Sequence, residues 1–214
     1  MALPLSRRAA LFALGSTVLL GSCTIASDGK NTPDSASASE GALKTVTPGK
    51  LTIATGEPAY SPWVENNDPA SGKGFEAAIA YAVAGKLGFA NADVVWVRST
   101  FDAAVAPGAK DWDFNLQQFS ITEERRKAVD FSSPYYTTAQ AVVTLKGSPV
   151  SGATTVAELK GALLGAQTGT TSHRMLTETV APTTAPSVFN NSQDTVQALK
   201  GGQVDAIVVD LPTA

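Results

Sequence analysis

The chain has 214 residues, and 16 Lys and Arg against 19 Asp and Glu give it a formal net charge of -3. Hydrophobic residues make up 43% and charged residues 16%, which is too apolar for a mostly disordered chain and typical of a folded one. The acidic balance argues against a nucleic-acid partner. A single Cys and a single His exclude an internal disulfide and the usual zinc-site spacings, so we expect neither a metal nor a cofactor.

Residues 1–22 have the architecture of a secretory signal peptide. The basic pair Arg7 and Arg8 precedes an uncharged apolar run at 9–20, which is shorter than the ~20 residues that a helix needs to cross a bilayer. We therefore expect export of the protein and removal of this segment. The two arginines also fit the twin-arginine route, with the general secretory route as the default.

The only cysteine of the chain, Cys23, follows this apolar run directly. The segment Leu20-Gly21-Ser22-Cys23 resembles the lipobox of bacterial lipoproteins, in which the cysteine becomes the lipidated first residue. This resemblance implies an extracytoplasmic protein that is lipid-anchored to the cell membrane. The alternative is an incidental cysteine in an ordinary signal peptide. Residues 23–43, rich in small and polar residues, predict a flexible tether after the lipidated cysteine.

From residue 44 onward, short β-rich runs alternate with helical patterns. The patterns predict strands at 51–54, 94–97, 114–119, 141–145, 163–167 and 204–209, and helices at 74–87, 101–106, 122–129, 156–160, 171–180 and 195–200. Such alternation predicts an α/β fold with helices on both faces of its sheets. The alternation restarts after a turn at 146–149, which predicts a first lobe at 44–143 and a second at 144–214.

The most informative motifs are Ser120-Ile121-Thr122-Glu123-Glu124-Arg125 and Asp130-Phe131-Ser132-Ser133-Pro134-Tyr135-Tyr136. Together with Gly56-Glu57-Pro58-Ala59-Tyr60-Ser61-Pro62-Trp63, Gly74-Phe75-Glu76 and Gly169-Thr170-Thr171, they resemble family 3 of the bacterial extracellular solute-binding proteins, in the same order, over residues 44–214. This resemblance implies a two-lobed type II periplasmic-binding-protein fold. The second lobe would be incomplete in this chain, because family members continue with a return crossing and further strands and helices.

The resemblance also implies a function without catalysis. Members of this family bind a free amino acid between their lobes and deliver it to the permease of an ABC importer, so we expect a monomeric receptor. Polar and basic amino acids both remain open as ligands. The alternative on the same fold is an enzyme resembling cyclohexadienyl or prephenate dehydratase, but we find neither the catalytic acid nor the added cations that a dicarboxylate substrate would require.

The resemblance places the ligand carboxylate on Arg125, whose planar guanidinium suits bidentate binding. Thr170 and Thr171 would assist at the start of a predicted helix, where backbone N–H groups are free, and Gly169 would allow the tight turn before it. Residue type alone favours a solvated helix surface for Arg125, beside Arg126 and Lys127, and it is the surrounding motif that favours the binding role; the alternative for the Gly-Thr-Thr run is an ordinary turn and helix cap.

For the ligand's ammonium group, the resemblance points to Asp210, the Ser120 hydroxyl and the Gln118 carbonyl. A turn-capping role for Asp210 is the alternative, and Asp205 is expected to be structural. The walls of the pocket would be Tyr60, Trp63 and Phe101, for which ordinary core packing is equally consistent with residue type.

Glu57 occupies a position where some family members place an acid that contacts a cationic ligand side chain. The chain departs from the family pattern at Gln117-Gln118-Phe119, where smaller residues are common, and at Glu76, where Asp is commoner. These departures leave the ligand's identity open. The pattern gives no role to Arg98, Gln167 or His173, and His173 is expected at the surface.

Overall fold

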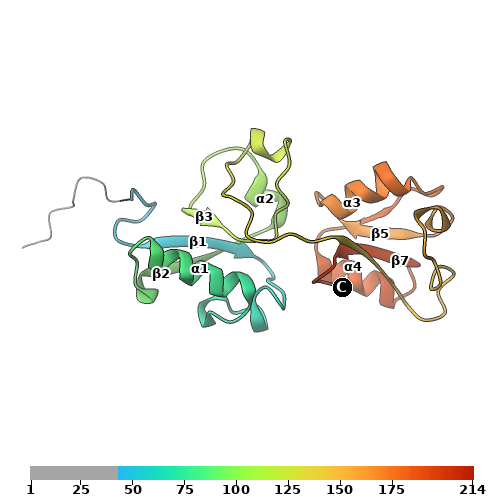
Figure 1. Ribbon diagram of the computed structural model, residues 1–214, viewed down its shortest axis with the longest axis horizontal. Helices are drawn as coiled ribbons and strands as arrows, with labels where there is room; N and C mark the ends of the chain where they lie inside the picture. Colours follow the sequence, from blue (N-terminus) through green and yellow to red (C-terminus); the bar gives the residue numbers. More distant parts are fainter. Residues whose placement is uncertain (1–42) are drawn as a thin grey trace, which may run out of the picture. The chain divides into compact units, whose positions relative to one another are not determined.

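The computed structural model describes residues 43–214 (Figure 1). The predicted signal peptide, Cys23 and nearly all of the predicted tether lie outside the described residues. Within 43–214, every helix is either too short or too polar to cross a membrane.

The first sheet is parallel and has the strand order β2-β1-β3. Its strands are β1 (Leu51–Gly56), β2 (Val94–Ser99) and β3 (Phe114–Asn115), and its helices are α1 (Phe75–Lys86) and α2 (Phe101–Val105). Every residue of the central strand β1 is buried, and α1 lies along one face of the sheet (Figure 1). Leu51 and Ile53 of β1 pack against Ala80 and Ala84 of α1, whose small side chains let the helix approach the sheet closely.

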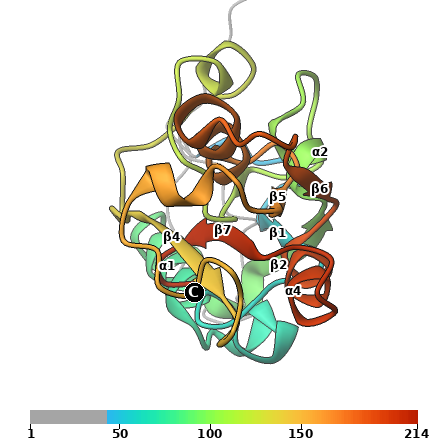
Figure 2. The same cartoon turned by 90° about the vertical axis from the view of Figure 1, so that its right-hand side faces the viewer.

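The second sheet has the strand order β4-β7-β5-β6, with β4 antiparallel to β7 and the other pairs parallel (Figure 2). Its elements are β4 (Gln140–Thr144), β5 (Leu164–Gln167), α3 (Thr171–Met175), a π-helical turn η6 (Leu176–Val180), β6 (Ser187–Phe189), α4 (Ser192–Lys200) and β7 (Ala206–Asp210). Alternate residues of β7 face opposite sides. Val208 joins a core with Leu176, and Ile207 joins a second core with Leu199 of α4.

Short 3-10 turns connect these elements. They are η1 (Glu65–Asn67), η2 (Pro69–Ser71), η3 (Asn91–Asp93), η4 (Arg125–Lys127) and η5 (Val156–Leu159). The helix predicted at 156–160 is therefore this single turn, η5, and the helix predicted at 171–180 is α3 continued by η6.

The helix predicted at 122–129 does not form. Only η4 is present, although the Thr122 Oγ1 accepts a hydrogen bond from the Arg125 backbone N–H at 3.2 Å, as the predicted cap would. Residues 123–127 form an unbroken charged run with no apolar face, and a short helix without packing does not repay the entropy of nucleation. The strand predicted at 114–119 is also wrong beyond Asn115, because Gln118 adopts a left-handed backbone with φ of 53°.

The second sheet contains features that the sequence pattern did not predict. The three residues of β6 are too few to give a periodic signal. Helix α4 begins at Ser192, earlier than predicted, because Asn191 caps it by accepting a hydrogen bond from the Asp194 N–H at 2.8 Å. Strand β4 pairs along its whole length with β7, so residues 140–143, which we expected in the first lobe, belong to the second sheet.

Candidate ligand-binding site

A cavity of about 210 Å³ lies where the carboxyl ends of strands from both sheets converge. Its lining comes from the segments that end or follow β1, β2, β3, β5, β6 and β7, namely residues 55–60, 100–101, 117–118, 120, 125, 167, 170–172, 190–192, 195, 208–210 and 213. In open α/β sheets, ligands bind at the carboxyl ends of the strands, because the loops there are free to present side chains. The cavity is small, which suits a small ligand.

All but one of the predicted ligand-binding residues line this cavity: Glu57, Tyr60, Phe101, Gln118, Ser120, Arg125, Thr170, Thr171 and Asp210. The exception is Trp63, which is only 4% exposed and packs edge-on against Phe75 and Tyr136, at ring-centroid distances of 5.8 and 5.3 Å. The expectation that Trp63 forms a cavity wall is therefore wrong, and its alternative, core packing, is what the structure contains. Its indole Nε1 donates a 3.4 Å hydrogen bond to Thr213 Oγ1, whose residue does line the cavity.

Arg125 is held in place from both sheets. Its Nη1 donates to the Ser120 carbonyl oxygen at 2.8 Å, and its Nη2 donates to the Gly169 carbonyl oxygen at 2.9 Å. The guanidinium carbon lies 5.3 Å from the ring centre of Phe101 and 5.5 Å from that of Phe119, within cation–π range. Burial, and next the charge of Arg174, lower the pKa of Arg125, but its ordinary value is so high that it remains a cation.

Asp210 provides the opposite charge at the end of β7. Gln140 Nε2 donates a hydrogen bond to Asp210 Oδ1, and the Ser172 hydroxyl donates to Gln140 Oε1, which fixes the orientation of the Gln140 amide. Burial raises the pKa of Asp210, whereas the Gln140 hydrogen bond and the positive charge of Arg125 lower it. The cavity therefore presents a cation and a carboxylate that interact electrostatically.

Gln118 is held by the buried acid Glu76, which is 1% exposed. Glu76 accepts hydrogen bonds from the Gln118 backbone N–H at 2.8 Å, from the Gln118 side-chain amide and from the Tyr135 hydroxyl. Burial raises the pKa of Glu76, and it also raises that of Tyr135. The sequence singled out Glu76 only as a departure from the family pattern, whereas the structure shows that it fixes the left-handed backbone of Gln118.

Several contacts cross the cavity between the two sheets' loops. The Ser120 and Thr171 hydroxyl oxygens are 3.2 Å apart, and the Gln193 backbone N–H donates to the Tyr60 hydroxyl oxygen at 3.3 Å. Gly169 has a left-handed φ of 68°, and a Cβ at this position would collide with the Asp102 carboxylate. The left-handed backbone is the reason for a glycine here, since the exposed Asp102 side chain could move away from a Cβ.

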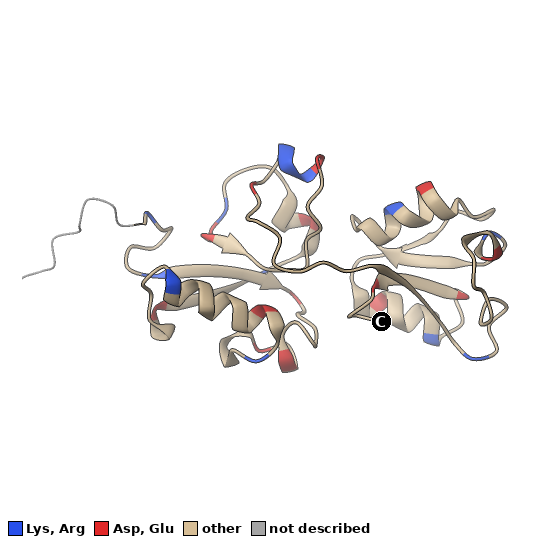
Figure 3. Ribbon diagram, in the orientation of Figure 1, with Lys and Arg blue, Asp and Glu red and all other residues tan. Residues whose placement is uncertain are grey.

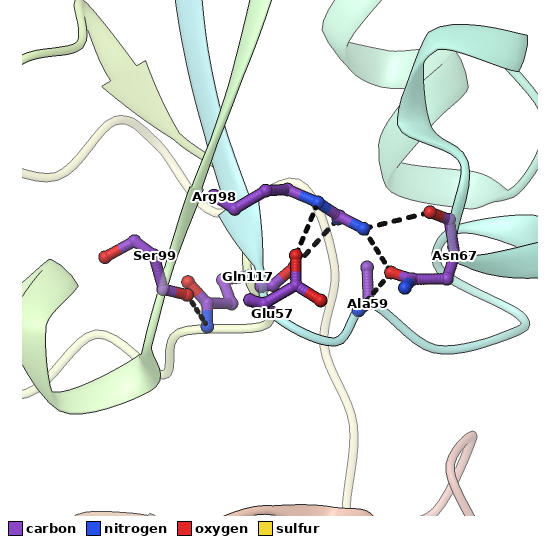
Figure 4. Close-up of polar contacts among 7 residues, drawn as sticks. Glu57, Ala59, Asn67, Arg98, Ser99 and Gln117 are labelled. Atoms are coloured by element: carbon purple, nitrogen blue, oxygen red, sulfur yellow. Dashed lines mark hydrogen bonds and ion pairs between the residues drawn. The ribbon is translucent and has the colours of Figure 1, made fainter.

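Glu57 lines the cavity but is already paired with Arg98 (Figure 4). The Arg98 Nε lies 3.0 Å from Glu57 Oε2, and the Arg98 Nη1 donates to the Gly56 carbonyl oxygen at 2.8 Å. Arg98 itself is not among the lining residues.

Of the residues to which the sequence gave no role, some line the cavity and others lie outside it. Gln167 lines the cavity and accepts a hydrogen bond from the Ser192 hydroxyl at 3.0 Å, whereas His173 is partly buried outside it. Asp205 supports the turn before β7, because its Oδ2 accepts a hydrogen bond from the Leu163 N–H at 2.8 Å.

Sequence reasoning missed lining residues of neutral polar type, namely Thr55, Thr100, Gln117, Ser172, Asn190, Asn191, Ser192, Thr195 and Thr213. Their position after strand ends was the available signal, but β6 was not predicted.

Charge is sparse at the cavity, where Glu57, Arg125 and Asp210 are the charged lining residues. Elsewhere, charged residues lie mainly on helices, turns and strand ends, and the strands themselves are mostly uncharged (Figure 3). Residues 43–214 contain no group of His, Cys, Asp and Glu side chains that could hold a metal ion.

Comparison with known proteins places this chain in a family. Residues 51–202 match the bacterial extracellular solute-binding proteins, family 3. A protein of Campylobacter jejuni subsp. jejuni serotype O:2 named "Probable histidine-binding protein" is 32% identical over 170 residues, which cover 77% of this chain and 62% of that protein. The chain thus spans less than two thirds of the length of this curated relative.

Two solved structures agree with this match. An ancestral arginine-binding protein bound to glutamine has a TM-score of 0.65 and 33% identity, covering 77% of this chain and 70% of that one. An ancestral amino-acid-binding protein described as a precursor of cyclohexadienyl dehydratase has a TM-score of 0.65 and 28% identity, covering 77% of this chain and 72% of that one. Both are described as binding proteins, as is the curated relative. The chain therefore belongs to family 3 of the bacterial extracellular solute-binding proteins and has their type II α/β fold, as its motifs predicted.

Proposed function

We propose that this chain captures a free amino acid in the cavity between its two sheets and delivers it to the permease of an ABC importer. The observation that carries this proposal is the presence of Arg125 and Asp210, of opposite charge and both partly buried, in the lining of one small cavity. A free amino acid carries a carboxylate and an ammonium group close together, so this pair of side chains complements both of its charges.

Arg125 is suited to the ligand carboxylate. A guanidinium has five N–H donors in a planar fork, and the hydrogen bonds to the Ser120 and Gly169 carbonyl oxygens use only part of them. Stacking over Phe101 and Phe119 restricts the side chain, so little further entropy is lost when a carboxylate binds. The Thr171 hydroxyl, on the opposite side of the cavity, would add a donor to the same carboxylate.

Asp210 is suited to the ligand ammonium, together with the Ser120 hydroxyl and the Gln118 carbonyl. Among residues 43–214, no hydrogen bond to the Gln118 carbonyl oxygen is present, and the bonds to Glu76 hold this residue in its left-handed conformation. Because Gln140 and Ser172 fix the Asp210 carboxylate beforehand, the site is organised before a ligand arrives.

Isothermal titration of the purified full chain with the common amino acids tests this proposal. For the amino acid that binds, two analogues should bind much more weakly: the α-amide, which lacks the carboxylate, and the N-acetyl derivative, which lacks the ammonium. Each analogue leaves one buried charge of the protein without its partner. Equal affinity for the amino acid and both analogues, or no binding of any amino acid, would refute the proposal.

We further propose that the protein is lipid-anchored through Cys23 on the outer side of the cell membrane. The support is the lipobox-like segment before Cys23 and the extracellular character of the family. Replacing Cys23 by Ala should move the protein from the membrane fraction to the soluble fraction, whereas Ser27→Ala, a short way further on in the tether, should leave it in the membrane. Membrane retention of the Cys23→Ala variant would contradict the anchor.

A further inference from the structure

Glu57, which lines the cavity, is paired with Arg98, which lies outside the lining. The Arg98 Nε is 3.0 Å from Glu57 Oε2, and the Arg98 side chain is 26% exposed whereas that of Glu57 is 52% exposed. Glu57 is among the lining residues and Arg98 is not, and the two side chains meet through the ion pair drawn in Figure 4. The negative charge of Glu57 is therefore already balanced by Arg98 before a ligand enters the cavity.

The guanidinium of Arg98 is anchored through all three of its nitrogens. In addition to the ion pair, its Nη1 donates to the Gly56 carbonyl oxygen at 2.8 Å, and its Nη2 donates to both the carbonyl and the side-chain oxygen of Asn67, the former at 2.9 Å. Asn67 is itself fixed, because its Oδ1 also accepts from the Ala59 N–H at 2.8 Å. Arg98, in β2, is thus held by hydrogen bonds to the end of β1 and to the loop that follows it, and is not a freely moving surface side chain.

The remaining lining of the cavity is neutral. If Arg125 and Asp210 bind the two charges common to all amino acids, Glu57 is the only other charged lining residue within 43–214, and Arg98 balances it. The lining is rich in carboxamides, which both donate and accept hydrogen bonds: Gln117, Gln118, Gln167, Asn190 and Asn191.

We propose that Arg98 is a specificity-determining residue that cancels the charge of Glu57 and makes the cavity select an uncharged polar side chain, of carboxamide type, over a guanidinium or ammonium side chain. This inference rests on the proposed function. A cationic side chain would have to leave water and approach Glu57 against the positive charge of Arg98, so its desolvation would not be repaid. A carboxamide meets no such repulsion and finds complementary donors and acceptors in the lining.

The test compares four ligands, L-glutamine, L-asparagine, L-arginine and L-lysine, by isothermal titration of the full chain. The wild type should bind glutamine or asparagine at least about tenfold more tightly than arginine or lysine, a modest ratio because Glu57 is half-exposed and solvent screens its charge. In Arg98→Gln, which keeps a polar amide but removes the positive charge, arginine affinity should rise by about tenfold. In the double variant Glu57→Gln with Arg98→Gln, that gain should disappear.

Two further variants keep the inference falsifiable if Arg98→Gln does not fold. Arg98→Lys retains the charge and should keep the preference for the neutral ligands. Glu57→Gln leaves the Arg98 charge uncompensated, so L-glutamate should gain affinity relative to L-glutamine by about tenfold. An unchanged ratio in Glu57→Gln, or wild-type binding of arginine tighter than of glutamine, would overturn this inference while amino-acid capture stands. Failure of every amino acid to bind would remove the proposed function and this inference with it.

Discussion

Arg125 and its sequence neighbour Arg126 show how the tertiary position of a residue decides its role. Both belong to the charged run at 123–127, yet Arg125 lines the cavity and stacks over Phe101, whereas Arg126 is exposed and pairs with Glu123 at 3.8 Å. An exposed pair of that kind contributes little to stability.

Replacing Arg125 by Ala should weaken binding of the recognised amino acid by about 2–5 kcal/mol, because the ligand carboxylate would be buried without its partner. Arg125→Lys should give an intermediate loss, since a point charge replaces the planar fork. Isothermal titration measures both effects, and Arg126→Ala is the matched control that should retain wild-type affinity. Wild-type affinity in Arg125→Ala would contradict the assignment of the carboxylate to this residue.

Glu76 makes stability depend on pH in a defined direction. Its pKa is raised in the folded protein, mainly by burial, so its contribution to stability is fully present below the ordinary Glu pKa and is lost as the pH rises through the folded value. The stability of the wild type relative to Glu76→Gln should therefore fall with rising pH, with a slope of at most about 1.4 kcal/mol per pH unit.

Urea unfolding of both proteins, from below the ordinary Glu pKa to above neutrality, measures this difference. The exposed Glu123, changed to Gln, is the control whose free energy of unfolding should run parallel to that of the wild type. Parallel curves for the wild type and Glu76→Gln would show that burial does not perturb Glu76.

At the scale of secondary-structure elements, the ends of strands and the starts of helices place the lining residues. Thr170 caps α3 by accepting from the His173 N–H at 3.1 Å, and Asn191 caps α4, so both caps stand at the cavity immediately after β5 and β6. The same residues thus end the loops, start the helices and line the site. Capping and lining are coupled because both occur at the carboxyl ends of parallel strands.

The cap of α4 should be measurable on its own. Asn191→Ala removes the acceptor for the Asp194 N–H and should lower the free energy of unfolding by about 1 kcal/mol, the usual effect of losing a helix cap. Asn191→Ser keeps a side-chain acceptor for this N–H without adding a charge beside the Asp194 carboxylate, to which the Asn191 amide donates at 2.8 Å, so it should lose less stability than Asn191→Ala. Urea midpoints measure both changes, and equal losses in the two variants would mean that the cap is not what Asn191 contributes.

At the scale of the whole described unit, polar contacts link the loops of the first sheet to those of the second. They include Ser120 with Thr171, Arg125 with Gly169, and Tyr60 with Gln193. Each buried core cluster within 43–214 belongs to one sheet's half and none spans both, so we expect the two sides to separate and close around a ligand by hinge motion.

Trp63 should report this motion by its fluorescence. Its indole donates to Thr213, which follows β7, whereas Trp96 donates to Tyr81 and Trp112 lies under Lys110, all within the first sheet's half. Addition of the bound amino acid should change the emission of the wild type and of Trp112→Phe but not that of Trp63→Phe. A full ligand-induced change in Trp63→Phe would place the movement elsewhere.

The family, the fold and most of the lining could be predicted from the sequence because they depend on local motifs. Arg125 and Thr171 stand in short motifs that are visible in the sequence, and Asp210 ends a strand, so all three come to the cavity at the ends of strands or in the loops that follow them. The extent of α1 was predicted correctly, but the face that it buries, with Ala77, Ala80 and Ala84, is not marked by large apolar residues and could not be predicted from the pattern.

The tertiary structure decided what depends on residues distant in sequence. Trp63 lies in the core because it packs against Phe75 and Tyr136. Glu76 accepts a hydrogen bond from the Gln118 backbone N–H, and the charge of Glu57 is paired with that of Arg98. A sequence shows which side chains are present but not which pairs meet, because contact across such separations is fixed only when the strands pair and the helices pack. The residues proposed to bind the ligand's carboxylate and ammonium groups could therefore be found from sequence motifs. The net charge that the cavity presents to the ligand's side chain depends on the Glu57–Arg98 pair, which forms only in the folded protein.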